Sequence, residues 1–77
     1  MSVKITEAQR ARAEKDLKDA KWKKVQAIEK LGKTLEIAKT ESGWEEFVAE
    51  DTKRVQYWEN YIARLEEILA KGEIEVA

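Results

Sequence analysis

The chain contains no proline, and its three glycines stand at positions 32, 43 and 72. Segments without proline that are rich in Glu, Lys, Ala and Leu favour helix, whereas glycine is common just past a helix end or in a turn. The glycines therefore bound two helix-forming segments, residues 6–31 and 51–71, within one small domain that spans residues 1–77. The conformation of the segment between them decides the fold.

The first expected helix, residues 6–31, opens with Thr6 and Gln9, which have the spacing of a capping box. Placing its residues at about 100° each gives one apolar stripe, with Val25 at its edge: Ala13, Leu17, Ala20, Ile28 and Leu31. Lys21 and Lys24 fall within this stripe, where their methylene stems cover apolar surface while the ammonium groups stay in water. The stripe therefore predicts a helix face that is only partly shielded from water.

The second expected helix, residues 51–71, ends before Gly72 and carries Lys71 beside the negative end of its dipole. Its main apolar stripe repeats at intervals of three and four: Val55, Trp58, Ile62, Leu65 and Leu69. Tyr57, Tyr61 and Ile68 form a second row about 100° further round the helix. A helix with two apolar sides is usually packed between two surfaces. The second surface then belongs to another copy or another protein, unless the rest of this chain covers both rows.

The central segment, about residues 34–49, is predicted as a two-stranded antiparallel β-hairpin. Glu41, Ser42 and Gly43 would form its loop, and Ile37 would then pair with Phe47. Asp51 would become the N-cap of the second helix. The expected fold class is therefore α+β, with a long helix, a hairpin, a second helix and a short extended tail.

An all-α antiparallel helical hairpin is the alternative for the same segment. Ser42 and Glu45 have capping-box spacing, and Trp44, Val48, Asp51 and Val55 continue the apolar repeat of the second helix. Against it, Asp51 would lie in the seam, where an unpaired carboxylate is costly. The tail, residues 73–77, places Ile74 and Val76 on one side; it either pairs with the hairpin, adds a strand to a neighbour's sheet, or frays.

The composition gives no support for catalysis or for a bound cofactor or metal. The chain has no Cys and no His, so the usual nucleophile–base pairs and thiolate or imidazole metal ligands are missing. Neighbouring carboxylates such as Glu66 and Glu67 diverge on a helix. No segment approaches the roughly 20 apolar residues that span a bilayer, so we expect a soluble protein that is not an enzyme.

The charge distribution and the apolar residues expected at the surface indicate that the chain binds other proteins. Residues 1–40 carry 11 basic and 6 acidic side chains, whereas residues 41–77 carry 4 and 10. Four lysines surround Trp22, which predicts at most a weak or indirect contact with nucleic acid. The predicted partner-binding residues combine the aromatic residue of the first helix, the second row and the tail: Trp22, Tyr57, Tyr61, Ile68, Ile74 and Val76.

With a helix, a hairpin and a helix in this order, the chain resembles the gpW-like family of small head–tail joining proteins of tailed phages. The resemblance is carried by the hairpin EIAKTESGWEEFVA, residues 36–49, and by YIARLE, residues 61–66. The chain is also similar to a family of small phage proteins that open with Ile-Thr, here Ile5-Thr6, and carry Tyr-Trp-Glu in the second helix, here Tyr57-Trp58-Glu59.

The resemblance implies a structural virion protein, assembled in the host cytoplasm as a ring of copies between the portal and the neck or tail proteins. A ring needs two different faces that meet, and a basic half followed by an acidic half is one way to supply them. Two other functions stay open: a small phage or bacterial inhibitor of the anti-restriction or anti-CRISPR type, and a helical protein–protein adaptor.

Overall fold

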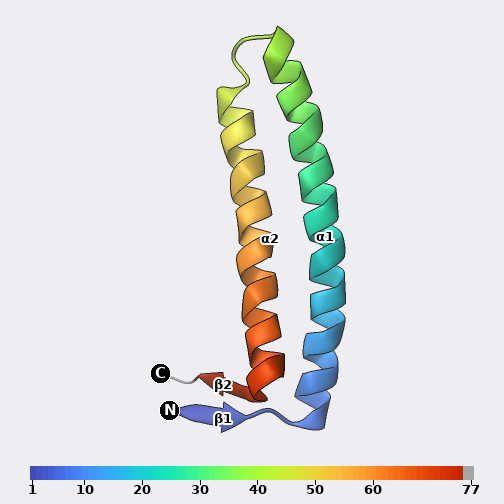
Figure 1. The fold of residues 1–77 in the computed structure, drawn as a ribbon, viewed down its shortest axis with the longest axis vertical. Coiled ribbons are helices and arrows are strands. Elements are labelled where there is room, and N and C mark those ends of the chain that lie inside the picture. Colours follow the sequence, from blue (N-terminus) through green and yellow to red (C-terminus); the bar gives the residue numbers. More distant parts are fainter. Residues whose placement is uncertain (76–77) are drawn as a thin grey trace.

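In the computed structural model, which describes residues 1–75, two long antiparallel helices are closed at one end by a two-stranded sheet (Figure 1). The elements in order are β1 (Ser2–Lys4), α1 (Glu7–Thr40), α2 (Glu45–Lys71) and β2 (Glu73–Glu75). The chain therefore combines two helices with an antiparallel strand pair, as the α+β class requires, and helix dominates. The strands, however, come from the two ends of the chain.

The predicted β-hairpin at residues 34–49 is wrong. Helix α1 continues nine residues past the predicted end at residue 31, and α2 begins at Glu45 instead of Asp51. A short connection, residues 41–44, joins the helices, with Gly43 in the left-handed region at φ 88°. The antiparallel helical hairpin, which was the alternative, is the correct description of this segment.

Local sequence explains the outer helix ends but not the inner start of α2. The Thr6–Gln9 capping box is formed, with the Thr6 hydroxyl accepting from the Gln9 amide at 3.1 Å and the Gln9 side chain accepting from the Thr6 amide at 2.9 Å. Gly72 ends α2 in the left-handed conformation, at φ 67°, as its position predicted. The Ser42–Glu45 capping box is absent, because Trp44 occupies the N-cap position and makes no side-chain cap.

The seam between the helices is built from small side chains on α1 and larger ones on α2. The buried residues of α1 recur every seven positions: Ala13, Ala20, Ala27 and Thr34. Those of α2 are Asp51, Val55, Ile62 and Leu65. Such a seven-residue repeat is typical of two helices that stay in contact along their length. The main stripe predicted for α2 is therefore confirmed at its three buried aliphatic positions.

Two residues predicted near the core of α1 lie at the surface. Ile28 is 47% exposed and Val25 is 45% exposed, whereas Ala27 is buried. The predicted stripe followed a period of 3.6, but the contact with α2 follows 3.5 and passes through Ala27 instead of Ile28. An apolar flank of α1 is consequently left uncovered.

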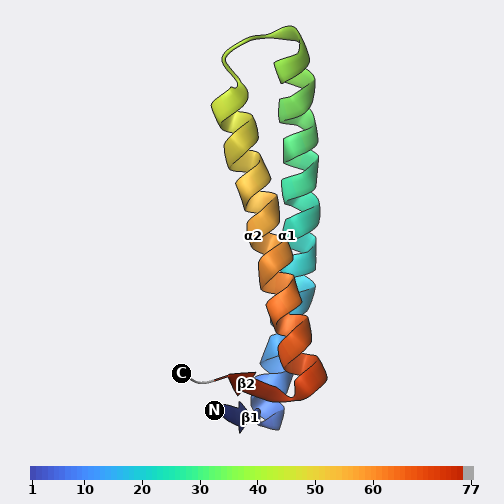
Figure 2. The same ribbon diagram turned by 60° about the vertical axis from the view of Figure 1, so that its left-hand side comes forward.

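The tail pairs with the start of the chain. Strand β2 lies antiparallel to β1, with Val3 opposite Ile74, and the Ile5 amide donates to the Gly72 carbonyl at 3.0 Å. Residues 73–75 therefore neither fray nor extend a central hairpin. Both ends of the described chain meet at the foot of the rod (Figure 2).

Candidate interaction surface

Three aromatic side chains of α2 form a cluster halfway along the rod. Tyr57 and Tyr61 stack with ring centroids 6.3 Å apart, and Trp58 meets each of them edge-on, at 5.1 and 5.8 Å. Tyr57 is 59% exposed, while Trp58 and Tyr61 are half-buried. The Trp58 ring at the seam is therefore in contact with the two tyrosine rings, which reach the surface.

Charged residues surround this cluster on both sides. A hollow between the helices is lined by the three rings together with Asp16, Asp19, Ala20 and Lys23 of α1. A second hollow, towards the connection, is lined by Tyr57, Trp58, Glu50, Lys53 and Arg54. We call the side of the rod that carries the three rings and these two hollows the aromatic face. An apolar centre with a charged rim is the usual organisation of a protein–protein interface.

Of the predicted partner-binding residues, the structure brings together Tyr57 and Tyr61. Trp58, which the sequence placed in the seam, also contributes to this face, because its ring bridges the two tyrosines. The spacing of Tyr57, Trp58 and Tyr61 indicates the two contacts with Tyr61, since residues three and four apart on a helix are neighbours on its surface.

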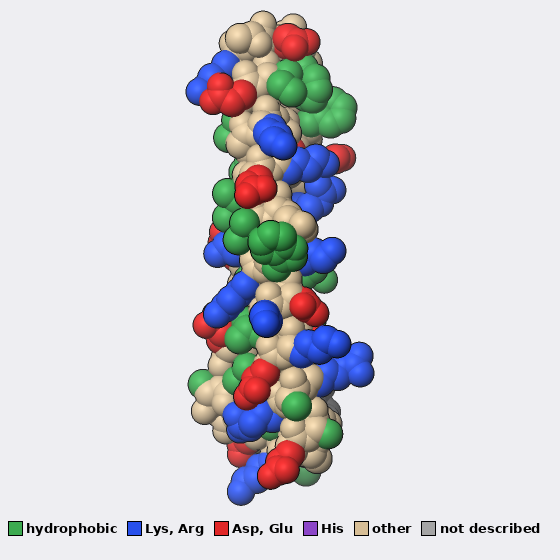
Figure 3. All heavy atoms as spheres, turned by 90° about the vertical axis from the view of Figure 1, so that its right-hand side faces the viewer, with side chains coloured by type: hydrophobic (Ala, Val, Ile, Leu, Met, Phe, Trp, Pro, Cys, Tyr) green, Lys and Arg blue, Asp and Glu red, His purple; other side chains and the backbone are tan. Residues whose placement is uncertain are grey.

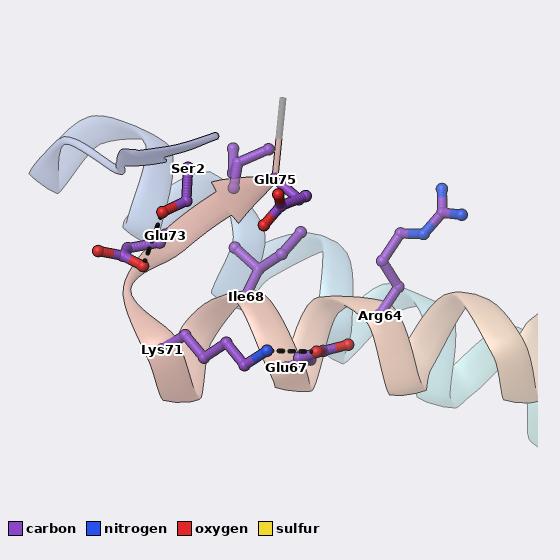
Figure 4. A pocket seen from close by; sticks show the side chains of 8 residues that line it. Ser2, Arg64, Glu67, Ile68, Lys71, Glu73 and Glu75 are labelled. Carbon is purple, nitrogen blue, oxygen red and sulfur yellow. Dashed lines mark hydrogen bonds and ion pairs between the residues drawn. The ribbon is translucent and has the colours of Figure 1, made fainter. Parts of the chain in front are cut away.

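Ile68 and Ile74 lie elsewhere, in a hollow at the foot of the rod (Figure 4). Ile68 points from α2 towards strand β2. The other residues that line the hollow are polar: Ser2, Arg64, Glu67, Lys71, Glu73 and Glu75. Ser2 Oγ donates to Glu73 Oε2 at 3.1 Å, which ties the two strands together beside this hollow. Val76, the remaining predicted residue of the tail, lies outside the described residues.

A surface ion pair borders the hollow at the foot. Lys71 Nζ donates to Glu67 Oε1 at 2.7 Å, one helical turn apart. This hydrogen bond and the charge of Lys71 lower the pKa of Glu67, and the same contact raises the pKa of Lys71. The pair also places a cation in the last turn of α2, where it faces the negative end of the helix dipole.

Trp22 is separate from the aromatic face. Its side chain is 62% exposed and lines a hollow on α1 with Lys18, Asp19, Lys21 and Val25. Figure 3, which looks onto the outer side of α1, shows basic and acidic side chains along its length with apolar side chains between them. The predicted residues therefore lie at three places, of which only the aromatic face joins both helices.

One buried polar site was missed by the sequence analysis. Thr34 Oγ1 of α1 donates to Asp51 Oδ2 of α2 at 2.6 Å, and the Lys30 carbonyl, at 3.1 Å, is a second acceptor for the same hydroxyl. Arg54 at 3.4 Å and Lys30 at 3.9 Å supply positive charge to the other carboxylate oxygen. Asp51 is thus buried but paired. The argument against a helix in this segment, that an unpaired carboxylate in the seam is costly, therefore does not apply.

Comparison with known proteins adds no functional information: no family model matches the chain, and neither the curated proteins nor the solved structures searched show significant similarity to it. Across residues 1–75, no group of three or more Asp or Glu side chains is arranged to hold a metal ion. No helix in the same range has the length and apolarity needed to cross a bilayer.

Proposed function

We propose that this protein is a helical protein–protein adaptor whose aromatic face packs against further helices. The observation that carries the proposal is the thickness of the fold. The rod measures 51 × 24 × 14 Å, and a single helix with its side chains is about 10–12 Å across. The two helices therefore lie side by side, and within residues 1–75 no further helix or sheet covers either broad side of the pair.

Burial supports the same proposal. Within the described residues, no large side chain is fully buried, and the most enclosed apolar residue is Ala20, at 2% exposure. The larger seam residues Val55, Ile62 and Leu65 keep 8–9% exposure. A second layer on the aromatic face would complete the burial of this seam and of the exposed ring of Tyr57. Because burial of apolar surface contributes roughly 25 cal/mol per Å², the gain would be large relative to the stability of so small a domain.

A phage head–tail connector is a specific form of adaptor, and it stays a prediction. Its support is the exposed Tyr57 of the second row of α2 and the opposite charge of the two halves of the chain. Its other support, a central β-hairpin, is lost because residues 34–49 belong mainly to the two helices. A connector ring requires different faces to meet head to tail, whereas an adaptor of the kind proposed here uses the aromatic face.

Site-specific photocrosslinking in the producing cells tests the adaptor function. A benzophenone amino acid replaces Tyr57 in the full chain, and the adducts formed on illumination are identified by mass spectrometry. We expect one dominant adduct of defined mass. The exposed fraction of Tyr57 means that the larger side chain can be accommodated without rebuilding the seam.

The matched control places the same crosslinker at Glu29. Glu29 is exposed and lies about 200° round α1 from the buried Ala27, so it points away from the seam. We expect little or no adduct from this position. Equal crosslinking from both positions, or none from position 57, would show that the aromatic face is not an interface.

A further inference from the structure

We infer that the aromatic face binds an acidic helix of another protein, with one carboxylate of that helix at Lys30 and Arg54 and an apolar side chain beside Tyr57. This inference rests on the proposed function and names the chemistry of the partner. The observation behind it is the position of the two cations. They come from different helices and meet at Asp51, and Arg54 also lines the hollow of Tyr57 and Trp58.

Asp51 brings the two cations together but does not neutralise both of them. Its Oδ1 lies 3.4 Å from Arg54 Nη1 and 3.9 Å from Lys30 Nζ, while its Oδ2 accepts from Thr34. Among the described residues, Asp51 is the only acidic partner of either cation. One negative charge therefore faces two positive charges, which leaves an excess of one positive charge at this place.

The excess charge is accessible from outside the molecule. The side chain of Lys30 is 63% exposed and that of Arg54 is 49% exposed, whereas that of Asp51 is 6% exposed. Within residues 1–75 the Arg54 guanidinium donates one hydrogen bond, to Asp51, so its other N–H groups stay available. Arginine binds carboxylates through such paired N–H groups. A carboxylate of another protein therefore fits this position.

The hollow beside the cations supplies the apolar contact. Arg54 precedes Tyr57 by three residues and Trp58 by four, so the rings lie about one helical turn from the guanidinium. Residues three or four apart on a partner helix are neighbours at a similar spacing. An Asp or Glu within one turn of a large apolar residue therefore makes both contacts at once. Arginine, tyrosine and tryptophan are also the residues that most often dominate the energy of an interface.

Acidic residues near the rings disfavour a nucleic acid as the occupant. Asp16 and Asp19 line the hollow between the helices, nearer the foot of the rod than Lys30, and Glu50 lines the hollow with Arg54. A nucleic acid carries a negative charge at every phosphate, so a strand lying along the face would meet these carboxylates as well as the cations. A helix that presents one carboxylate to the cations and apolar residues to the rings avoids this repulsion.

Crosslinking followed by peptide binding tests the inference. The adduct formed from position 57 is digested, and mass spectrometry locates the crosslinked segment of the partner. We expect an Asp or Glu within one turn of a large apolar residue in that segment. The segment is then synthesised as a peptide, and its dissociation constant for the full chain is measured by titration calorimetry.

Charge variants show whether the carboxylate is recognised at Arg54. Arg54→Gln keeps an amide donor but removes the charge, so it should raise the dissociation constant about tenfold. A peptide with Lys in place of its acidic residue should bind the unchanged protein more weakly by a similar factor. The same Lys peptide should bind the Arg54→Glu protein at least about fivefold more tightly than it binds the unchanged protein, because opposite charges are restored.

A matched control is Lys21→Glu, which changes the net charge as Arg54→Glu does. Lys21 lines the hollow of Trp22 on α1, so this variant should leave the dissociation constant unchanged. Arg54→Glu places a second carboxylate beside Asp51, and circular dichroism melts of each variant therefore accompany the titrations. If Arg54→Glu does not fold, Arg54→Gln decides the outcome.

The outcomes separate this inference from the adaptor function. The acidic helix is ruled out if the crosslinked segment has no Asp or Glu near an apolar residue, if the adduct is a second copy of this chain, or if Arg54→Gln leaves the dissociation constant unchanged. The adaptor function stands in each of these cases. An adduct with nucleic acid, or no adduct from position 57, rules out both proposals.

Discussion

Thr34 Oγ1 lies 2.6 Å from Asp51 Oδ2 and donates a hydrogen bond to it across the buried seam between α1 and α2. Removing this donor with Thr34→Val keeps the shape of the side chain but leaves the buried carboxylate with one bond fewer. Because hydrogen bonds to charged groups contribute about 1.5–3 kcal/mol, we expect the free energy of unfolding to fall by that amount in urea titrations followed by circular dichroism. Thr40→Val is the control: its hydroxyl donates to the Ile37 carbonyl at an exposed site, so a comparable loss there would contradict the assignment.

Replacing both members of the pair with apolar residues should have a different effect. In Thr34→Val/Asp51→Leu no buried charge needs a partner, and the apolar side chains fill a similar space. Exchanges of this kind are often neutral or stabilising, so we expect the double variant to be at least as stable as the unchanged protein. A double variant less stable than Thr34→Val alone would show that the pair contributes more than its desolvation costs.

Gly32 lies inside α1 with open space around it. A Cβ added there meets no atom within 4 Å, and glycine in a helix interior is destabilising by roughly 0.5–1 kcal/mol relative to alanine. We therefore expect Gly32→Ala to raise the free energy of unfolding by that amount in thermal and urea melts. A loss of stability would indicate that α1 bends or frays at this position in solution.

Gly72 should respond in the opposite direction. Its φ is 67°, and an added Cβ would lie 3.2 Å from Arg10 Nη2. Side chains in the left-handed region cost about 1–2 kcal/mol, so Gly72→Ala should lower the free energy of unfolding by about that much. If the two alanine variants behaved alike, the end of α2 would not be where the structure places it.

The Glu67–Lys71 pair gives a prediction about pH. The hydrogen bond from Lys71 lowers the pKa of Glu67, so the pair stabilises the fold above the ordinary pKa of a glutamate and loses this effect as the pH falls through the lowered value. Lys71→Gln should raise the pKa of Glu67 towards its ordinary value, as measured by NMR titration. Lys39→Gln, which removes a lysine from the other end of the rod, should leave the pKa of Glu67 unchanged.

The start of α1, the end of α2 and the main stripe of α2 followed from local rules because each depends on nearby residues. Thr6 and Gln9 satisfy each other within one turn, and Gly72 adopts a conformation that few other residues tolerate. The spacing of Val55, Ile62 and Leu65 likewise reports a single helix face. Such features can be predicted without knowing what the helix packs against.

The central segment was mispredicted because its conformation depends on a contact across the fold. Asp51 argues against a helix only if its carboxylate is alone in the seam, and Thr34, its partner, lies 17 residues away. Period-two alternation in Leu35, Ile37, Phe47 and Ala49 then suggested strands. In the helices, Leu35 is 43% and Phe47 53% exposed, so this alternation has no core to face.

The aromatic face could be anticipated only in part. Tyr57 and Tyr61 were identified from their position off the main stripe, but part of their charged surroundings comes from α1 and depends on how the two helices are aligned. The seven-residue repeat of small residues in α1 indicates which face of α1 contacts α2 and so how the two helices are aligned. It was hidden because alanine is common on every face of a helix.

The pairing of β1 with β2 has a consequence for how this rod can be joined to other proteins. Chain segments linked before residue 2 and after residue 75 would leave from neighbouring points, while the connection at residues 41–44 sits at the opposite pole. Insertions into a host loop are best tolerated when the ends of the insert are close together. Inserted in this way, the helical hairpin would project from its host, with the connection at residues 41–44 held at a fixed distance above the host surface.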